Sequence, residues 1–333
     1  MRVLITGAAG FLGAHIVEHL LVNTDWDIVC LDSFHHKGVA ERIADSTYYQ
    51  ANKDRVSVVT HDLTAPLSRM AMTKIGRVDY IINAASQSHV DRSIDDPVPF
   101  AQNNMNLMLN MLQYARLAHP SVFIQISTDE VYGPAPDGTK HKEWASILPS
   151  NPYSGSKAAQ EAMCIAYWRT YGVPVVITNT MNLIGERQDP EKFVPMVMKK
   201  VLAGEEMVIH GTPDNIGSRF YIHCRNQADG LLFILKNLKP AKYPDTDRPD
   251  RYNIVGEKEM NNLEMAELIA KLLDKPLKYR FEDFHKTRPG HDRRYALDGK
   301  KLADLGWQPP IDLETSLKRT VDWTLENREW LDV

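Results

Sequence analysis

The sequence predicts an α/β fold built on a doubly wound parallel sheet, followed by a smaller C-terminal α/β domain. Short apolar runs alternate with longer amphipathic stretches, which is typical of strand–helix–strand units. A glycine-rich turn joins the first predicted strand to the first predicted helix. The alternation weakens after about residue 185. We therefore expect a first domain over residues 1–185 and a second mainly over residues 186–333, with the chain free to cross back to the sheet.

Six strands are predicted in the first domain, each from a short and mainly apolar run, and the first of them is expected to be buried. They cover residues 3–6, 27–32, 55–60, 78–83, 122–127 and 173–178. Helices are predicted over residues 10–22, 100–118 and 153–171, and over 262–273 and 313–330 in the second domain. The segment 240–250 is rich in Pro and Asp and is expected to be an exposed loop. In such open sheets, ligands bind at the C-terminal ends of the strands.

Composition and charge exclude several classes of partner. The 333 residues carry a net charge of −4, so no basic excess indicates nucleic acid or an anionic membrane surface. No apolar run is long enough to span a membrane, and the N-terminal run is too short for a signal peptide. Cys30, Cys164 and Cys224 are widely spaced, which favours reduced thiols in a cytoplasmic protein. The neighbouring His35 and His36 point to opposite sides of an extended chain, so no metal site is expected.

A glycine-rich turn indicates a dinucleotide site. Gly7, Gly10 and Gly13 follow the first strand and open a helix, with Phe11 and Leu12 between the last two glycines. Glycines allow a tight turn and close approach of the backbone to a pyrophosphate, while the helix N-terminus offers free N–H groups. The spacing GxxGxxG is shifted from GxGxxG, so a purely structural turn remains the alternative.

Asp32 favours NAD as the dinucleotide. It ends the second strand, where a carboxylate can accept hydrogen bonds from both ribose hydroxyls and would repel a 2′-phosphate. An ordinary turn cap before Ser33 is the alternative. Other strand ends supply the remaining residues of this Rossmann-type site. They are Asp62 and Leu63 near the adenine, and Ala84, Ala85 and Ser86 along the cofactor backbone.

A tyrosine and a lysine spaced four apart indicate redox chemistry on an alcohol. Tyr153 and Lys157 share one face of a predicted helix. A nearby ammonium favours phenolate and so is expected to lower the pKa of the tyrosine. The phenolate can then take the proton of a substrate alcohol while hydride leaves for a nicotinamide. A bare YxxxK also occurs by chance, but here it follows a glycine-rich strand–helix unit.

Two neighbouring carboxyl groups, Asp129 and Glu130, close the fifth predicted strand. Like charges raise one of the two pKa values, so one group can serve as an acid and the other as a base. A solvated acidic turn is the alternative reading.

These motifs together resemble a known superfamily. The glycine turn TGxxGFxG, Asp32, Ser127–Thr128 and YxxxK resemble the extended short-chain dehydrogenase/reductases. The resemblance implies that Thr128 hydrogen-bonds the substrate alcohol beside the tyrosine. The run STDEVYG resembles nucleotide-sugar 4,6-dehydratases, dTDP-glucose 4,6-dehydratases above all. By that resemblance, Asp129 protonates the leaving 6-hydroxyl and Glu130 removes the C5 proton.

The same resemblance supplies a set of expected substrate contacts. The run RPGHDRRY over residues 288–295 is the longest match, in which Arg288 would contact phosphate in bidentate fashion and His291 would add a donor. A charged loop is the alternative. The other expected contacts are Ser88, His89, Thr128, Asn182, Lys192, Val208, His210, Arg219 and Asn253. For Ser88 and His89, a helix N-terminal cap is a comparable explanation.

Several positions depart from the family pattern. Asn179 stands where the family usually has Arg, Leu183 replaces an Asn, and Gly155 replaces an Ala. We expect these changes to lie near the substrate, so they leave the nucleobase and the sugar open. In this family the helices over residues 100–118 and 153–171 pack across a twofold axis as a four-helix bundle. A homodimer is therefore expected, although a helix buried within the monomer would look similar.

The expected activity is oxidation of C4 by NAD⁺, elimination of water across C5–C6, and return of hydride to C6 of a sugar nucleotide. A 4-epimerase is the first alternative, which the Asp129–Glu130 pair disfavours. A UDP-glucuronate decarboxylase is the second, since it needs Glu130 but not Asp129. A catalytically silent NAD-binding protein is the third, and the full set of reactive side chains disfavours it.

Overall fold

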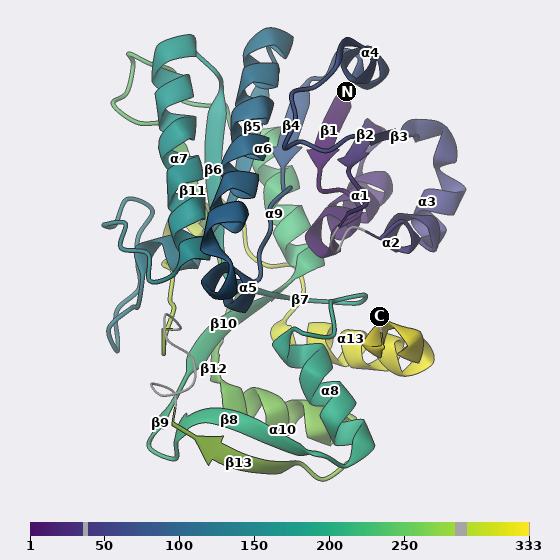
Figure 1. Ribbon diagram of the computed structural model, residues 1–333, viewed down its shortest axis with the longest axis vertical. Helices are drawn as coiled ribbons and strands as arrows, with labels where there is room; N and C mark the ends of the chain where they lie inside the picture. Colours follow the sequence, from purple (N-terminus) through teal and green to yellow (C-terminus); the bar gives the residue numbers. More distant parts are fainter. Residues whose placement is uncertain (36–38, 284–291, 333) are drawn as a thin grey trace.

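The computed structural model describes residues 1–35, 39–283 and 292–332. A seven-stranded parallel sheet forms its larger half, in the order β11-β6-β5-β4-β1-β2-β3 (Figure 1). The chain runs outward from β1 in both directions, so the strand order switches between β1 and β4. The strands are β1 (Arg2–Thr6), β2 (Asp27–Asp32), β3 (Val56–Thr60), β4 (Tyr80–Asn83), β5 (Val122–Thr128), β6 (Val175–Thr180) and β11 (Asp250–Ile254). The doubly wound parallel sheet expected from the sequence is confirmed.

Helices cover both faces of this sheet because alternate strand residues are apolar on both sides. In β1, Val3 and Ile5 face the core beneath α1 (Phe11–Asn23) and α9 (Cys224–Asn237). Leu4 faces the opposite core beneath α4 (Arg69–Ile75), α6 (Pro97–Ala118) and α7 (Pro152–Tyr171). The shorter helices are α2 (Glu41–Ala44), α3 (Thr47–Ala51), α5 (Val90–Asp95) and α12 (Lys300–Asp304).

The helix ends follow local chemistry. Asn151 caps α7 in a reciprocal capping box, and Pro152 occupies its first turn, where a missing N–H costs nothing. Gly172 ends α7 in the left-handed region, at φ 69°. The cap and the proline place the start of α7 one residue before the start expected from the sequence.

The six strands predicted from the sequence are confirmed, with ends shifted by up to two residues. The seventh strand, β11, was missed because its sequence DRYNI carries charged and polar residues where a buried strand is usually apolar. Arg251 and Asn253 are nevertheless fully buried. Their burial depends on partners elsewhere in the fold, which a periodicity argument cannot see.

The smaller half carries two three-stranded sheets, seen at the bottom of Figure 1. One contains β7 (Asn182–Ile184), β10 (Ser218–His223) and β12 (Glu259–Asn261), and the other β8 (Glu206–Thr212), β9 (Asn215–Ile216) and β13 (Lys278–Glu282). Its helices are α8 (Phe193–Ala203), α10 (Asn262–Leu272) and α13 (Leu313–Glu326). They share a third apolar core with these sheets. The chain leaves this half to form α9 and β11 on the main sheet, so we propose two lobes joined by several crossings.

Candidate active site

The glycine turn is held by close backbone packing between β1, α1 and the end of β4. A Cβ on Gly7 would lie 2.9 Å from Ala85 Cα, and one on Gly13 would lie 2.0 Å from the Gly7 carbonyl oxygen. The Thr6 hydroxyl accepts hydrogen bonds from the backbone N–H groups of Ala84 and Ala85, each at 3.1 Å. Side chains are therefore excluded where the two strand ends meet the helix.

The start of α1 leaves donors available for an anion. Gly10 is the N-cap residue and provides no side-chain cap, so the first-turn N–H groups lack the acceptor that a Ser or Asp would supply. Asp32 is buried at the end of β2, and it accepts the N–H of Ala9 and the N–H of Phe34, both at 2.9 Å. Asp32 thus stabilises the turn, as the turn-cap alternative proposed. Each carboxylate oxygen still keeps a second lone pair that could accept a hydrogen bond from a ribose hydroxyl.

The remaining predicted cofactor residues follow the same edge of the sheet. Phe11 and Leu12 are half-buried in the first turn of α1. Asp62 is exposed and accepts the N–H of Thr64, whereas the Leu63 side chain packs into the core. Ser86 donates to the carbonyl of Gln87 at 3.2 Å. Ser33 is half-buried directly after β2.

Tyr153 and Lys157 both point into the buried junction between α7 and β5. They are 9% and 4% exposed. The Lys157 ammonium donates to the carbonyl of Ile126 at 2.8 Å. The backbone N–H of Tyr153 donates to the Ser93 hydroxyl at 3.1 Å, which ties α7 to α5. The phenol and the ammonium are therefore fixed on one helix beside the end of β5.

The pKa of Tyr153 departs from the expectation. Burial and the charge of Glu130 raise the pKa of the phenol, and a side-chain hydrogen bond with Thr128 opposes the rise. Burial lowers the pKa of Lys157 to about 8, against the opposing charge of Glu161. The predicted lowering of the tyrosine pKa by Lys157 is therefore wrong for the polypeptide alone. The ammonium is directed at the Ile126 carbonyl, and burial with neighbouring carboxylates dominates at the phenol.

Asp129 is the buried acid of the site. It begins a 3₁₀ turn over Asp129–Tyr132, directly after β5, and is 4% exposed. The Thr128 hydroxyl donates to Asp129 Oδ1 at 2.9 Å, and Oδ2 has no hydrogen-bond partner among the described residues. Burial, followed by the charge of Glu130, raises the pKa of Asp129 to about 7. Asp129 therefore retains a proton over much of the neutral range, as two adjacent carboxyl groups predicted.

Glu130 is held by polar groups from distant segments. Burial raises the pKa of its carboxyl group, while the Asn151 hydrogen bond and the charges of Arg219 and Lys192 oppose the rise. Asn151 Nδ2 donates to Glu130 Oε2 at 3.2 Å, and the Tyr295 hydroxyl lies 3.5 Å from the same oxygen. The amide of Asn151 and the cationic neighbours thus favour the charged form of Glu130 against the effect of burial.

Asn151 and Tyr295 were missed as site residues. Asn151 carried a signal, because an Asn directly before a Pro marks a helix N-cap and this cap adjoins Tyr153. Tyr295 ends the octapeptide that the sequence had singled out, but nothing in its type indicated contact with Glu130. Its ring lies 4.6 Å beneath the guanidinium of Arg219.

The cationic residues lie on the same side as Glu130. Arg219 is half-buried on β10 and donates to the carbonyls of Asp292 and Arg293, each at 2.6 Å. Lys192 is half-buried, and its ammonium lies 3.4 Å from the Ser88 carbonyl oxygen. Both charges act on Glu130. Arg288 and His291 lie outside the described residues.

Two predicted contacts have structural roles in this fold. His89 caps α5 by accepting the Arg92 N–H, so the capping alternative holds for this residue. Asn253 is fully buried, and its amide donates to the carbonyls of His141 and Asp298. Both hydrogens of that amide are therefore already used in holding loops together.

The other expected contacts occupy the smaller half. Asn182 is exposed at the start of β7, while Val208 and His210 are half-buried on β8. Asn179 was expected near the substrate, and this is wrong. It is fully buried on β6, where its amide donates to the Thr128 carbonyl from beneath the site.

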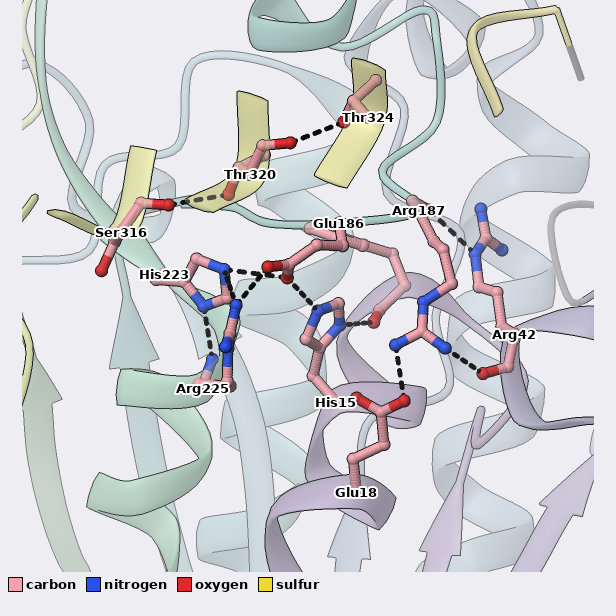
Figure 2. A network of polar contacts seen from close by, with 11 residues as sticks. His15, Glu18, Arg42, Glu186, Arg187, His223, Arg225, Ser316, Thr320 and Thr324 are labelled. Carbon is pink, nitrogen blue, oxygen red and sulfur yellow. Dashed lines mark hydrogen bonds and ion pairs between the residues drawn. The ribbon is translucent and has the colours of Figure 1, made fainter. Parts of the chain in front are cut away.

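A cluster of metal-ligating side chains joins the two halves (Figure 2). His15, Glu186 and His223 bring ligand-type atoms within 4.8 Å of one another. His223 Nδ1 accepts the Arg225 N–H at 2.9 Å, so Nε2 carries the hydrogen that bonds Glu186 at 3.1 Å. The Arg225 guanidinium also pairs with Glu186. The lone pair of His223 and the Glu186 carboxylate are therefore both engaged, and the cluster fits an ion-pair joint.

Within the parts of the chain that are described, no helix is both long and apolar enough to cross a membrane.

Comparison with known proteins gives a consistent result. Residues 3–254 match the model of the NAD dependent epimerase/dehydratase family. The dTDP-glucose 4,6-dehydratase of Shigella flexneri is 33% identical over 356 aligned positions, which cover 100% of this chain and 95% of that protein. The dTDP-glucose 4,6-dehydratase of Streptomyces venezuelae, solved with NAD and TYD bound, superimposes with a TM-score of 0.85 at 32% identity, covering 99% of this chain and 98% of that one.

An epimerase has a similar fold. The UDP-glucose 4-epimerase of Thermus thermophilus, solved with NAD, gives a TM-score of 0.83 at 26% identity, covering 97% of this chain and 98% of that one. Family model, sequence relatives and solved structures therefore agree on the fold and on the glycine-turn half. This chain belongs to the NAD dependent epimerase/dehydratase family.

Proposed function

We propose that this chain is a nucleotide-sugar 4,6-dehydratase of the dTDP-glucose 4,6-dehydratase type, working with bound NAD⁺. One observation carries the proposal. Asp129 and Glu130 lie side by side at the end of β5, and burial together with the Glu130 charge raises the pKa of Asp129 to about 7. A protonated acid beside a second carboxylate is what elimination of water requires. Dehydratase relatives at 33% identity over the full chain support it.

The residues present fit NAD⁺. The side-chain-free turn over Gly7, Gly10 and Gly13 and the uncapped start of α1 would hold the pyrophosphate, and Asp32 would hold the adenosine ribose. When bound, NAD⁺ supplies a hydride acceptor for C4, a positive charge on its nicotinamide and, once reduced, the hydride for C6.

In the first step, Tyr153, ionised under the positive charges of Lys157 and of the nicotinamide when NAD⁺ is bound, would take the proton of the C4 hydroxyl as the C4 hydride departs, and the Thr128 hydroxyl would hold the sugar oxygen. Lys157 supplies positive charge to the same junction, since its ammonium is fixed on the Ile126 carbonyl. The product is a C4 ketone. A ketone acidifies the hydrogen on the adjacent C5, which prepares the elimination.

In the second step, Glu130 removes the C5 proton and Asp129 gives its proton to the 6-hydroxyl, which leaves as water. A C5–C6 double bond forms. Glu130 then returns a proton to C5 as hydride reaches C6, so the sugar has lost one water and carries a 4-keto-6-deoxy group. The Thr128 hydrogen bond engages Asp129 Oδ1, and Oδ2, which has no hydrogen-bond partner among the described residues, would deliver the proton.

A few cationic side chains near the site can bind an anionic substrate even though the net charge of the whole chain is negative. Lys192 and Arg219 lie close enough to influence Glu130, and we propose that they and Arg288 contact the substrate diphosphate. Asn182, exposed at the start of β7, is proposed as a further donor to the sugar nucleotide.

A 4-epimerase is the second candidate, favoured by the structural likeness to the Thermus thermophilus epimerase. A panel of sugar nucleotides that includes dTDP-glucose and UDP-glucose separates the two. A dehydratase product is lighter by one water, whereas an epimerised sugar keeps its mass. A 4-keto-6-deoxy sugar also absorbs strongly in alkali.

We also propose that the chain forms a homodimer through α6 and α7, which lie side by side on the main sheet (Figure 1). The outer side of α7 carries small apolar residues, with Ala162 and Ala166 exposed and Ala159 half-exposed. Small residues allow a partner helix to approach closely. Sedimentation of wild type and of Ala162→Glu would test this, since a charge there should dissociate the dimer without unfolding the chain.

A further inference from the structure

A fully buried ion pair lies directly beneath the catalytic residues. Glu161 on α7 and Arg251 on β11 are both 0% exposed, and Arg251 Nη2 lies 2.7 Å from Glu161 Oε2. The Trp144 ring covers the guanidinium at 4.3 Å, and Arg251 Nη1 donates to the Tyr132 hydroxyl at 3.0 Å. Burying two charges is costly, and a well-packed apolar pair is often as stable. Stability alone is therefore a weak explanation for this pair.

One arm of the pair reaches Thr128. The second oxygen of Glu161, Oε1, accepts a hydrogen bond from Asn179 Nδ2 at 2.9 Å. The same amide nitrogen donates its other hydrogen to the Thr128 carbonyl, also at 2.9 Å. The Tyr132 hydroxyl lies 3.4 Å from Asn179 Oδ1, which closes a ring of contacts. The carboxylate of Glu161 thereby sets the backbone from which the Thr128 hydroxyl projects toward Asp129 and Tyr153.

The other arm reaches Lys157, one helical turn before Glu161 on α7. Burial lowers the pKa of Lys157, and the Glu161 charge is the largest opposing influence, followed by the thiol of Cys164. On β5, the Ile126 carbonyl oxygen accepts a hydrogen bond from the Lys157 ammonium. Around Glu161, the charged or titratable groups are Arg251, Tyr132, Cys164 and Lys157 itself.

We propose that Glu161 and Arg251 are positioning residues of this enzyme, holding Thr128 through Asn179 and fixing a carboxylate one helical turn from the Lys157 side chain. The inference rests on the proposed dehydratase function. Arg251 fixes the Glu161 carboxylate so that one oxygen faces Asn179. This positioning role also explains why β11 carries a buried arginine. The strand adds Arg251 to the residues that support the site.

The test measures kcat and KM for water loss from dTDP-glucose, together with the single-turnover rate of C4 oxidation across a range of pH, a step in which Asp129 has no role as acid. Glu161→Gln should move the alkaline limb of C4 oxidation about one pH unit lower and reduce that rate roughly tenfold on the limb, because the ammonium loses its carboxylate. KM should stay within about twofold, since neither residue contacts substrate. Arg251→Lys, which keeps a cation, should retain more activity than Arg251→Met. Asp322→Asn, in an exposed ion pair with Lys318, is the matched control and should change neither.

A second variant separates the two arms. Asn179→Ala leaves both charges in place and should lower kcat by about tenfold with the alkaline limb unmoved, because only the Thr128 contact is lost. Thermal melts establish that each variant is folded. If Glu161→Gln does not fold, Glu161→Asp replaces it, and the shorter side chain should shift the limb in the same direction by less.

Unchanged limbs in folded Glu161 variants would overturn the Lys157 arm, and an unchanged kcat in Asn179→Ala would overturn the Thr128 arm. A purely structural pair would lower the melting temperature and leave the pH profile as in the wild type. A wild type inert on every sugar nucleotide would remove the proposed function and this inference with it. An active wild type with an unmoved profile in Glu161→Gln would overturn the inference alone.

Discussion

The Thr128 hydroxyl donates a hydrogen bond to the buried carboxyl group of Asp129 at 2.9 Å, at the point where β5 ends. The same threonine side chain interacts with the Tyr153 phenol. A residue expected to bind the reacting alcohol is therefore also in contact with the group expected to expel water. Oxidation and elimination thus share one hydroxyl, which couples the two halves of the proposed reaction.

Replacing the acid should separate elimination from oxidation. Asp129→Asn cannot protonate the 6-hydroxyl, so water loss should slow by about 100-fold or more while C4 oxidation continues. The reduced cofactor should then accumulate and be seen by its absorbance when substrate is added. Asp322→Asn, at an exposed site, is the control. Wild-type turnover in Asp129→Asn would show that another acid acts.

Replacing the base should stop exchange at C5. Glu130→Gln removes the carboxylate that Asn151 and the cationic neighbours hold in place. Deuterium from heavy water should then no longer enter C5, as measured by mass or proton NMR. Continued exchange in this variant would require a different base.

The pH dependence of elimination follows from the raised pKa of Asp129. Because that pKa is about 7, the protonated acid is present below about pH 7 and is lost above it. The rate of water loss should fall by about tenfold per pH unit on the alkaline side. Single-turnover measurements should show this limb for water loss. A flat profile through this range would remove Asp129 as the acid.

The same group should affect stability. The folded state raises the pKa of Asp129 from 3.8 to about 7, so between these values the unfolded chain releases a proton that the folded chain retains. The wild type therefore loses stability as pH rises through this window. Relative to it, Asp129→Asn should gain roughly 2–3 kcal/mol in unfolding free energy between about pH 5 and pH 8. Urea unfolding at the two pH values measures this, and an equal difference at both would contradict it.

Two glycines should respond oppositely to the same change. A Cβ on Gly13 would lie 2.0 Å from the Gly7 carbonyl oxygen, so Gly13→Ala should distort the turn and abolish NAD binding. A Cβ on Gly155 meets no described atom within 4 Å, so Gly155→Ala should raise the stability of α7 by about 0.5–1 kcal/mol. Cofactor titration and thermal melts test the pair. Normal NAD binding by Gly13→Ala would contradict the tight turn.

The sequence was sufficient where a pattern is local. Strands β1 to β6 are short, mainly apolar runs, which the sequence pattern alone identifies as strands. The spacing of Tyr153 and Lys157 placed both on one helix face, and the adjacency of Asp129 and Glu130 predicted a raised pKa, to which Glu130 contributes after burial. The helix face and the adjacency need only neighbours along the chain.

It failed where the answer depends on distant partners. Strand β11 was not predicted because the burial of Arg251 depends on distant partners. One of them, Glu161, lies ninety positions away in the chain. The direction of the Tyr153 pKa shift depends first on burial and then on the charge of Glu130, neither of which helix spacing alone reveals. Asn179 resembled a substrate-side change until its contacts with Thr128 and Glu161 placed it beneath the site.

The most direct test of the dehydratase assignment is the mass of the product formed from dTDP-glucose in heavy water. The product should have lost one water and should carry one solvent deuterium at C5, because Glu130 exchanges its proton with solvent before returning it. Its mass should therefore be that of simple water loss plus one deuterium-for-hydrogen replacement. A product of unchanged mass with inverted C4, or a loss of water without deuterium at C5, would contradict the roles given to Asp129 and Glu130.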